Sequence, residues 1–181
     1  MPSLGLVLDQ DRGSLPFALV HGEPLVACAA WALGEAGVTL VDAGTPWSSI
    51  VVGAEPLVLH DPLCPLTPPG FIAGCLAHAL DTGRVVVGVR PVTDTVKLVE
   101  DGYAGATVDR DGLLQVCSPV VLPAAVVAAL EGPPGSDLAA LVAGLAGRFD
   151  VQPVEAPPEA RRVANEEDLR LLEALTAPMS T

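Results

Sequence analysis

The chain has 181 residues, which is enough for one domain with a substantial core, and we expect residues 1–181 to form a single domain. Half of the residues are hydrophobic but only 3% are aromatic, which argues against an intrinsically disordered chain and predicts a core of Ala, Val and Leu. Twenty-two acidic residues against nine basic ones give a net charge of −13, which argues against a protein that binds nucleic acid through its phosphates.

The cysteines and the apolar segments bear on the compartment. The four cysteines show neither a CxxC pair nor a metal-ligand spacing, so the sequence predicts reduced thiols and a cytoplasmic location. The N-terminal segment MPSLGLVLDQDRGS lacks the basic start and the long apolar core of a signal peptide. Residues 112–130 carry no charge, but Pro119 and Pro123 interrupt them, so we expect a strand, a turn and a helix there rather than a membrane span.

Taken in chain order, short apolar runs alternate with longer segments that favour helix. The expected strands are residues 4–8, 38–42, 57–60, 85–89 and 149–154, and the expected helices are residues 23–36, 68–81, 123–131, 136–147 and a last one after Asn165. We expect Thr67 to cap the second of these helices, with Pro68 in its first turn, and Asn165 to cap the last. Residues 43–56 are too rich in Gly, Pro and Ser to assign.

Two further segments predict an arm. Residues 96–99 and 106–109 flank the turn signal EDGY and are typical of two antiparallel strands. Elsewhere the alternation of strands and helices predicts an α/β fold with a mostly parallel central sheet flanked by helices. Ligands of such sheets bind beyond the carboxyl ends of the strands. We therefore expect a site near the loop after Leu8, near Asp61 and near residues 91–97.

Four motifs at predicted strand ends and near the C-terminus point to one family. They are LVLHDP at 57–62, RPVTDTVK at 90–97, TVDRDGL at 107–113 and NEEDLRLLEAL at 165–175. In order and spacing they resemble the 2-C-methyl-D-erythritol 4-phosphate cytidylyltransferases of isoprenoid precursor biosynthesis. The resemblance implies a Rossmann-like nucleotidyltransferase fold and a dimer in which an arm near residues 93–110 reaches the partner subunit. It also implies transfer of CMP from CTP to a polyol phosphate, with Mg²⁺ as cofactor and pyrophosphate as the second product.

The resemblance further implies roles for individual residues. Asp61 matches the aspartate of an HD motif that lies beside the metal and the substrate. Thr95 and Arg110 match positions expected to hold the substrate phosphate, a chemistry that suits a hydroxyl and a guanidinium. Ser118 stands where the family has the threonine of a T-P-Q motif. Cys64 replaces the arginine of the family motif H-D-A-A-R-P.

The first loop departs from the family pattern. Where the family has A-A-G-x-G-x-R-x-G followed by P-K-Q, this chain has VLDQDRGSLPFALVHGEPL, which lacks the lysine. Arg12 is the one candidate cation in this loop, and Arg162 stands near the place of the lysine in the family motif N-I-K. Each unit charge within about 5 Å of a triphosphate is worth about 1–3 kcal/mol. Since the loop offers Asp9 and Asp11 instead of a second cation, we expect weaker binding of CTP.

Two functions therefore stay open from the sequence. One is a cytidylyltransferase-like protein with weakened or absent CTP-dependent activity that keeps part of the polyol-phosphate site. The other is an active enzyme in which Arg12, Arg162 and Mg²⁺ on Asp61 replace the usual cradle. Both predict a homodimer and a phosphorylated small molecule or CTP as ligand, without nucleic acid or membrane. Lys97, the only lysine of the chain, is expected to pair with an acid such as Asp94 at the base of the arm.

Overall fold

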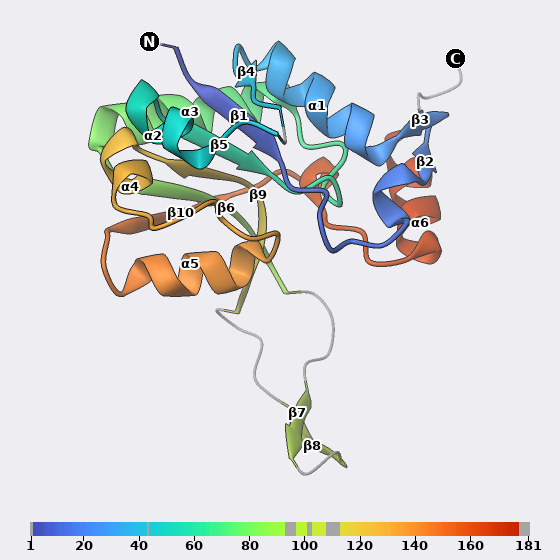
Figure 1. Ribbon diagram of the computed structural model, residues 1–181. Coiled ribbons are helices and arrows are strands. Elements are labelled where there is room, and N and C mark those ends of the chain that lie inside the picture. The colour runs from blue at the N-terminus through green and yellow to red at the C-terminus, as the bar shows by residue number, and fades with distance from the viewer. Residues whose placement is uncertain (1, 43, 93–96, 101–102, 108–112, 178–181) are drawn as a thin grey trace.

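A six-stranded sheet forms the centre of the protein in a computed structural model that describes residues 2–42, 44–92, 97–100, 103–107 and 113–177 (Figure 1). The strand order is β10-β6-β9-β5-β1-β4. The strands are β1 (Leu4–Val7), β4 (Thr39–Leu40), β5 (Leu57–His60), β6 (Val85–Pro91), β9 (Leu114–Leu122) and β10 (Val151–Glu155). β9 runs antiparallel to both of its neighbours, whereas the other neighbouring pairs are parallel. The mixed, mostly parallel sheet confirms the predicted fold class.

Helices cover both faces of this sheet. One face packs against α1 (Leu25–Glu35) and α3 (Pro69–Thr82), and the other packs against α2 (Trp47–Gly53), α4 (Ala124–Ala128) and α5 (Leu138–Ala146). Successive strand residues point to opposite faces of the sheet. In β6, Val85 and Val87 therefore pack on the face covered by α2, α4 and α5, and Val86 packs on the face covered by α1 and α3. Burial on both faces explains why the central strands are unbroken apolar runs.

A third, smaller core lies beside the sheet. It joins α6 (Glu166–Thr176) to the strand pair β2 (Leu19–Val20) and β3 (Glu23–Pro24), next to the 3₁₀ turns Leu15–Phe17 and Pro158–Ala160. Leu169 and Leu172 are the buried residues of α6. Asn165 caps the helix as predicted, because its Oδ1 accepts from the backbone N–H groups of Glu167 and Asp168. This core attaches the segment before α6 to the rest of the protein.

Several local predictions need correction. The N-cap of α3 is Pro68, not Thr67, whose Oγ1 donates to the backbone oxygen of Cys64 at 2.8 Å. The unassigned stretch contains α2, and the expected strand 38–42 shortens to β4. The strand at residues 85–89 was expected to be parallel, but it is parallel only to β10 and antiparallel to β9. No helix in the described ranges combines the length and apolar character needed to cross a membrane.

The predicted arm is present as a two-stranded antiparallel sheet. β7 (Lys97–Glu100) pairs with β8 (Tyr103–Thr107), and Figure 1 shows the pair extending away from the body of the protein. The expected pairing of Lys97 with Asp94 concerns side chains outside the described residues. The backbone pairing of β7 and β8 therefore agrees with the prediction of two antiparallel strands.

Gly88 allows β6 and β9 to approach closely where their register shifts. A Cβ atom at this position would lie 2.6 Å from the backbone oxygen of Ser118 and 2.9 Å from its carbonyl carbon. We expect Gly88→Ala to lower the free energy of unfolding by about 1–3 kcal/mol in urea titrations, because backbone atoms of a central strand cannot move aside easily. Gly34→Ala in α1 is the control, since nothing lies within 4 Å of its Cβ, and it should leave stability unchanged or raise it by about 1 kcal/mol. Equal effects of the two substitutions would contradict this account of Gly88.

Candidate active site

The candidate site lies where the loops after β1 and β5 leave the same edge of the sheet. These two strands are parallel, with Val7 paired to His60, and the backbone N–H of Leu8 donates to the oxygen of His60 at 2.9 Å. The loops that follow β1 and β5 therefore leave the sheet side by side. The 158–164 segment joins them, because the backbone N–H of Val163 donates to the oxygen of Leu63 at 2.7 Å. Three segments distant in sequence thus meet at one edge.

A single carboxylate, Asp61, lies at the centre of this edge. Its side chain is only 3% exposed, and its Oδ2 accepts from Arg12 Nη2 and from Arg162 Nε, each at 3.0 Å. The two arginine side chains are 13% and 27% exposed, so solvent screens them only in part. Since both nitrogens contact the same oxygen, they lie no more than about 6 Å apart. The structure therefore brings three of the sequence-predicted residues into one cluster.

The backbone around Asp61 fixes the orientation of its carboxylate. Its Oδ1 accepts from the backbone N–H of Leu63 at 2.9 Å, which is a typical Asx turn. The backbone N–H of Asp61 donates to Ser118 Oγ at 2.7 Å, and Ser118 is fully buried in β9. Ser118, predicted as a substrate-binding residue, therefore contacts the backbone of Asp61. Arg12 Nη2 also donates to the backbone oxygen of Ser136, which ties the first loop to the segment before α5.

One cavity of about 260 Å³ opens beside this cluster, at the ends of β1 and β4. Its lining residues include the apolar Val41, Trp47 and Ile50 and the polar Asp9 and Gln10. Asp11, the second acid of the loop, is exposed and has a positive φ of 57°. Of the two acidic residues noted from the sequence, only Asp9 is among the residues lining this cavity.

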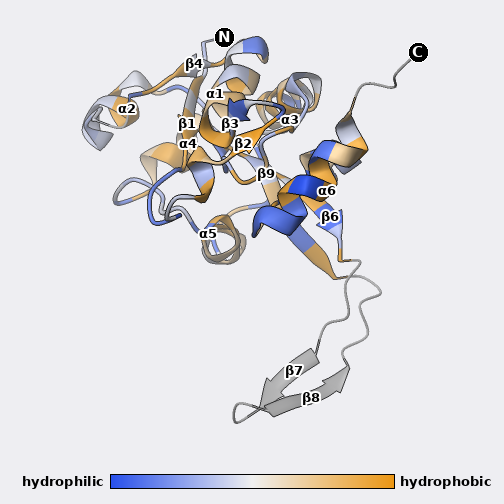
Figure 2. Ribbon diagram, turned by 90° about the vertical axis from the view of Figure 1, so that its right-hand side faces the viewer, coloured by the Kyte–Doolittle hydropathy of each residue, from blue (hydrophilic) through white to orange (hydrophobic). Residues whose placement is uncertain are grey.

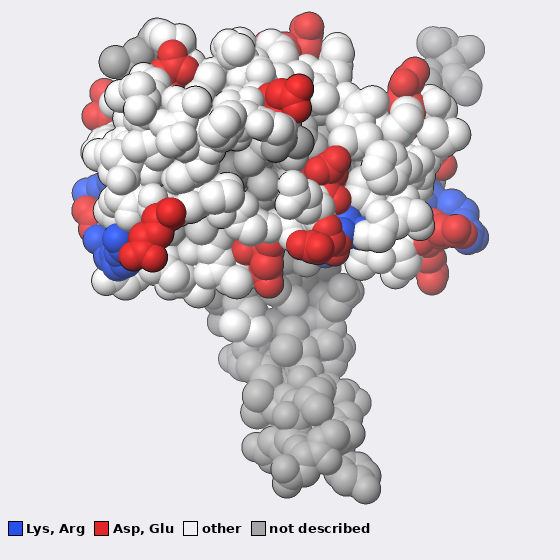
Figure 3. Space-filling view, in the orientation of Figure 1, with Lys and Arg blue, Asp and Glu red and all other residues white. Residues whose placement is uncertain are grey.

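A second cavity of about 560 Å³ lies on the other side of Asp61, between the end of β6, the start of β9, the segment before α6 and α6 itself. Figure 2 shows α6 beside the end of β6. Three arginines line this cavity: Arg90, Arg161 and Arg162. Arg90 Nη1 donates to the backbone oxygen of Ala156 at 2.9 Å. This concentration of cations contrasts with the net charge of −13, and Figure 3 shows acidic side chains scattered over the face in view with few basic ones between them.

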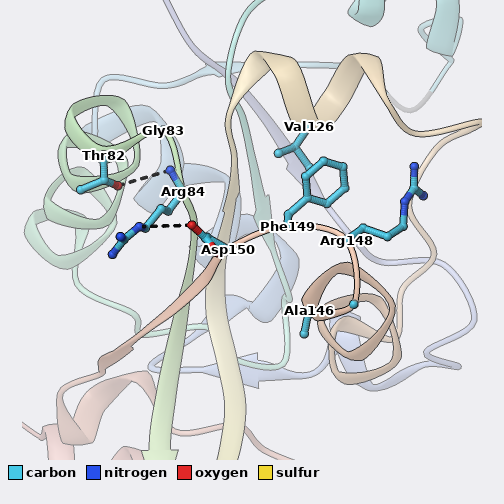
Figure 4. Close-up of a pocket in the computed structure, with 9 residues that line it drawn as sticks. Thr82, Gly83, Arg84, Val126, Ala146, Arg148, Phe149 and Asp150 are labelled. Atoms are coloured by element: carbon cyan, nitrogen blue, oxygen red, sulfur yellow. Dashed lines mark hydrogen bonds and ion pairs between the residues drawn. The ribbon is translucent and has the colours of Figure 1, made fainter.

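Another cavity, of about 690 Å³, lies away from the Asp61 cluster, where α3 ends and β6 begins (Figure 4). It also contains arginines, but they are engaged differently. Arg84 Nε lies 3.8 Å from Asp150 Oδ2 in a pair that is more than half exposed, and Arg148 lies over the ring of Phe149. Exposed pairs of this kind contribute little energy. The carboxyl edge of the sheet, with its buried cluster, is the better candidate site.

Comparison with protein-family models shows to which family the chain is related. The family model described as "IspD: 2-C-methyl-D-erythritol 4-phosphate cytidylyltransferase" matches residues 35–177. The chain belongs to this cytidylyltransferase family. Curated relatives with the name 2-C-methyl-D-erythritol 4-phosphate cytidylyltransferase include one from Syntrophotalea carbinolica, 36% identical over 65% of this chain and 52% of the relative, and one from Frankia casuarinae, 39% identical over 67% of this chain and 46% of the relative. The matched part of the chain spans about half the length of these relatives.

Solved structures agree with the family in fold. The crystal structure of 2-C-methyl-D-erythritol 4-phosphate cytidylyltransferase from Thermus thermophilus superposes with a TM-score of 0.69 at 25% identity, covering 97% of this chain and 98% of that one. The 4-diphosphocytidyl-2C-methyl-D-erythritol synthase from Anaerococcus prevotii gives a TM-score of 0.64 at 15% identity, covering 96% of this chain and 98% of that one, which bears on the fold alone. The nucleotidyltransferase fold predicted from the motifs is thus confirmed.

The structure places only some of the residues that the cytidylyltransferase motifs predict. Arg12, Asp61, Ser118 and Arg162 lie together, whereas Thr95 and Arg110 lie outside the described residues. Motif reasoning did not single out Arg90 and Arg161, which line the second cavity. Arg161 stands where the family motif N-I-K has isoleucine. This arginine in place of an apolar residue was the feature of the sequence that could have indicated an additional cation at the site.

Two buried thiols lie behind the arginines. The interaction with the Cys117 thiol, followed by burial, raises the pKa of Cys64, the residue that replaces the family arginine, well above its usual value. The same interaction, followed by the positive charges of Arg90 and Arg162, lowers the pKa of Cys117. Cys117 precedes Ser118 in β9, so the field of the arginines reaches the strand that supports Asp61.

His60, directly before Asp61, is fully buried in β5, and neither ring nitrogen has a hydrogen-bond partner within the described ranges. Burial lowers the pKa of this imidazole to about 4 from the ordinary value of 6.5. The native state therefore keeps His60 neutral between these two pH values, where the unfolded chain takes up a proton. The stability that depends on a neutral His60 is fully present above pH 6.5 and is lost as the pH falls towards 4.

We expect this residue to account for a loss of about 2 kcal/mol in the free energy of unfolding between pH 7 and pH 5. His60→Leu removes the titrating group and leaves no described hydrogen bond unmade. Urea titrations at pH 7 and pH 5 should show a pH dependence smaller by about this amount in the variant. Parallel pH profiles for the two proteins would mean that His60 is not the group responsible.

Proposed function

We propose that the chain transfers CMP from CTP to a polyol phosphate and releases pyrophosphate. The convergence of Arg12 and Arg162 on the buried Asp61 carries this proposal, because it supplies two cationic groups at the ligand-binding edge of the sheet. The relatives that the chain matches have the name of a cytidylyltransferase, and the solved relative from Thermus thermophilus has nearly the same extent. These findings favour the active enzyme over the weakened relative that the first loop suggested.

The geometry suits phosphoryl chemistry. In this reaction a phosphate oxygen of the acceptor forms a bond to the α-phosphorus of CTP while the bond from that phosphorus to the pyrophosphate oxygen breaks, and pyrophosphate leaves with the electron pair. Negative charge is spread over the phosphoryl oxygens in the transition state, so positioned cations account for most of the catalysis. Arg12 and Arg162 lie close enough together for one phosphoryl group to contact both. Asp61 fixes them in place before the substrates bind.

The nucleotide is expected on the β1 side of Asp61. The cavity there has apolar lining residues that suit a pyrimidine ring, and its polar lining residues include Gln10, Asp9 and Asp42. Arg12 links this cavity to the cluster through its hydrogen bond to Ser136. The acceptor is then expected on the opposite side, where Arg162 lines the second cavity.

Family members use Mg²⁺, and the residues present fit such an ion only in part. Asp61 Oδ2 accepts from both arginines and Oδ1 accepts from one backbone N–H, so among the described contacts only Oδ1 keeps a lone pair for an ion. No group of three or more His, Cys, Asp or Glu that could hold a metal occurs in the described part of the chain. Magnesium commonly uses one or two carboxylates together with substrate phosphates, and Asp9, which lines the cavity, would supply one such carboxylate. Bound there, the ion would neutralise phosphate charge.

A second candidate function is binding of a phosphorylated metabolite without turnover. One observation favours it: Asp61 already neutralises part of the charge of both arginines, and Asp9 and Asp42 line the nucleotide cavity. A triphosphate would then meet little net positive charge. The two candidates differ in CTP affinity and in turnover, which the same experiment measures.

We expect the wild-type protein to release pyrophosphate when supplied with CTP, 2-C-methyl-D-erythritol 4-phosphate and Mg²⁺. Arg162→Ala should lower kcat/KM by about 10²–10³-fold, the usual effect of removing a group that stabilises transition-state charge, and Arg162→Lys should retain part of the activity because it keeps the charge. Arg84→Gln, at an exposed ion pair away from the site, is the matched control and should leave kcat/KM within twofold of wild type. Calorimetric binding of the polyol phosphate without any pyrophosphate release would favour the second candidate instead.

The homodimer and the cytoplasmic location are parts of the same proposal. The extended β7–β8 arm is the segment that we expect to contact a second copy. Deletion of residues 98–107 should yield monomers by light scattering while the circular dichroism of the body stays unchanged. A dimer of undiminished stability in the deletion variant would rule out the arm as the dimer contact. All four cysteines are free thiols, which agrees with a reducing compartment.

A further inference from the structure

The second cavity has a charge that the family motifs do not account for. Among the described residues that line it, four are charged, namely Arg90, Arg161, Arg162 and Asp168, so cations outnumber anions by three to one in that set. The acid of this set is already engaged, because Asp168 Oδ2 accepts from the backbone N–H of Ala164 at 2.8 Å. With Arg12 included, four of the nine basic residues of the chain lie at this edge of the sheet. A strongly acidic protein thus reverses its charge locally at one concave surface, which is what an anionic ligand requires.

The three arginines differ in what they contact. Arg162 Nε bonds to Asp61, and Arg90 Nη1 bonds to the backbone oxygen of Ala156. Arg161 has no side-chain hydrogen bond or ion pair to any residue of the described ranges, although it is half-buried and lines the cavity. Its backbone is fixed, because its N–H donates to the oxygen of Pro158 as the 3₁₀ turn ends. Arg161 thus offers guanidinium donors to the cavity from a position where its backbone is hydrogen-bonded.

We propose that Arg161 binds the phosphate group of the acceptor substrate, with Arg90 as a second cation in the same cavity. The proposal rests on the proposed transferase function, since it assigns the acceptor to this side of Asp61. A guanidinium presents two parallel N–H groups to phosphate oxygens and keeps its charge at any pH that the protein experiences. The cavity volume of about 560 Å³ leaves room for a small polyol phosphate.

The order of the strands explains why the ligand is the acceptor rather than CTP. The nucleotide cavity lies at β1 and β4, and the arginine cavity lies at β6 and β9, with Asp61 at the end of β5 between them. Arg162 contacts Asp61 and also lines the arginine cavity, so it lies where the two substrates would meet. Arg161, its neighbour in sequence, belongs to the acceptor side alone. The lowered pKa of the Cys117 thiol, to which Arg90 and Arg162 contribute, agrees with a positive field there.

The test compares Arg161→Gln with Arg84→Gln. Calorimetry with 2-C-methyl-D-erythritol 4-phosphate should give an affinity about tenfold or more weaker for Arg161→Gln, the usual effect of losing a charge-assisted hydrogen bond. Arg161→Lys should recover part of the affinity, and Arg84→Gln should match wild type. In steady-state assays the KM for the polyol phosphate should rise by a similar factor, whereas the KM for CTP should stay within twofold. Urea titrations confirm that each variant is folded.

The outcomes separate this inference from the proposed function. Unchanged affinity for the polyol phosphate in Arg161→Gln, or no binding by the wild type, would overturn the assignment of Arg161. A larger loss for CTP than for the polyol phosphate would overturn it as well, because Arg161 would then belong to the nucleotide side. Arg161-dependent binding without any pyrophosphate release would support the phosphate subsite and count against the transferase.

Discussion

The double ion pair of Asp61 is the interaction on which the rest of the site depends. A carboxylate that is almost fully removed from water is costly unless charged donors satisfy it, and here two guanidinium groups and one backbone N–H do so. The same contacts join the first loop, the end of β5 and the segment before α6. Replacing one partner would leave an uncompensated charge behind, so the three segments depend on one another. The position of both arginines is therefore set by the buried acid rather than by either loop alone.

The fold follows from the sequence more directly than the site does. The unbroken apolar runs of β5 and β6 reflect strands buried on both faces, and Asn165 with its following acids specified the start of α6. The prediction that Thr67 caps α3 was wrong, because its hydroxyl donates to the backbone of the preceding loop and not to the helix. The stretch that contains α2 could not be assigned from the sequence because Gly, Pro and Ser are poor helix formers. The helix is stabilised by the packing of Ile50 against the sheet.

The cluster itself depends on contacts between residues far apart in sequence. Arg12 and Asp61 are 49 positions apart, and Asp61 and Arg162 are 101 positions apart. Motif comparison selected each of the three residues separately, and the parallel pairing of β1 with β5 brings the first two together. The hydrogen bond between Val163 and Leu63 brings in the third. Neither pairing is visible in any short window of the sequence, so the candidate residues were predictable and their mutual geometry was not.

The charge around the first loop in the folded protein also differs from the count of charges along its sequence. Counting charges along the loop gave one cation against two acids, but Asp11 is exposed and is not among the residues lining the cavity at the ends of β1 and β4. Meanwhile Arg90 and Arg161 come from a strand and from a segment before α6 that the loop comparison did not consider. Because Coulomb interactions depend on distance and burial rather than on sequence position, the relevant total is the one around Asp61 and its two cavities. Relative to the family motifs, the chain lacks the lysine of the first loop and has Arg161 in the second cavity, so its cations lie towards β6 and α6.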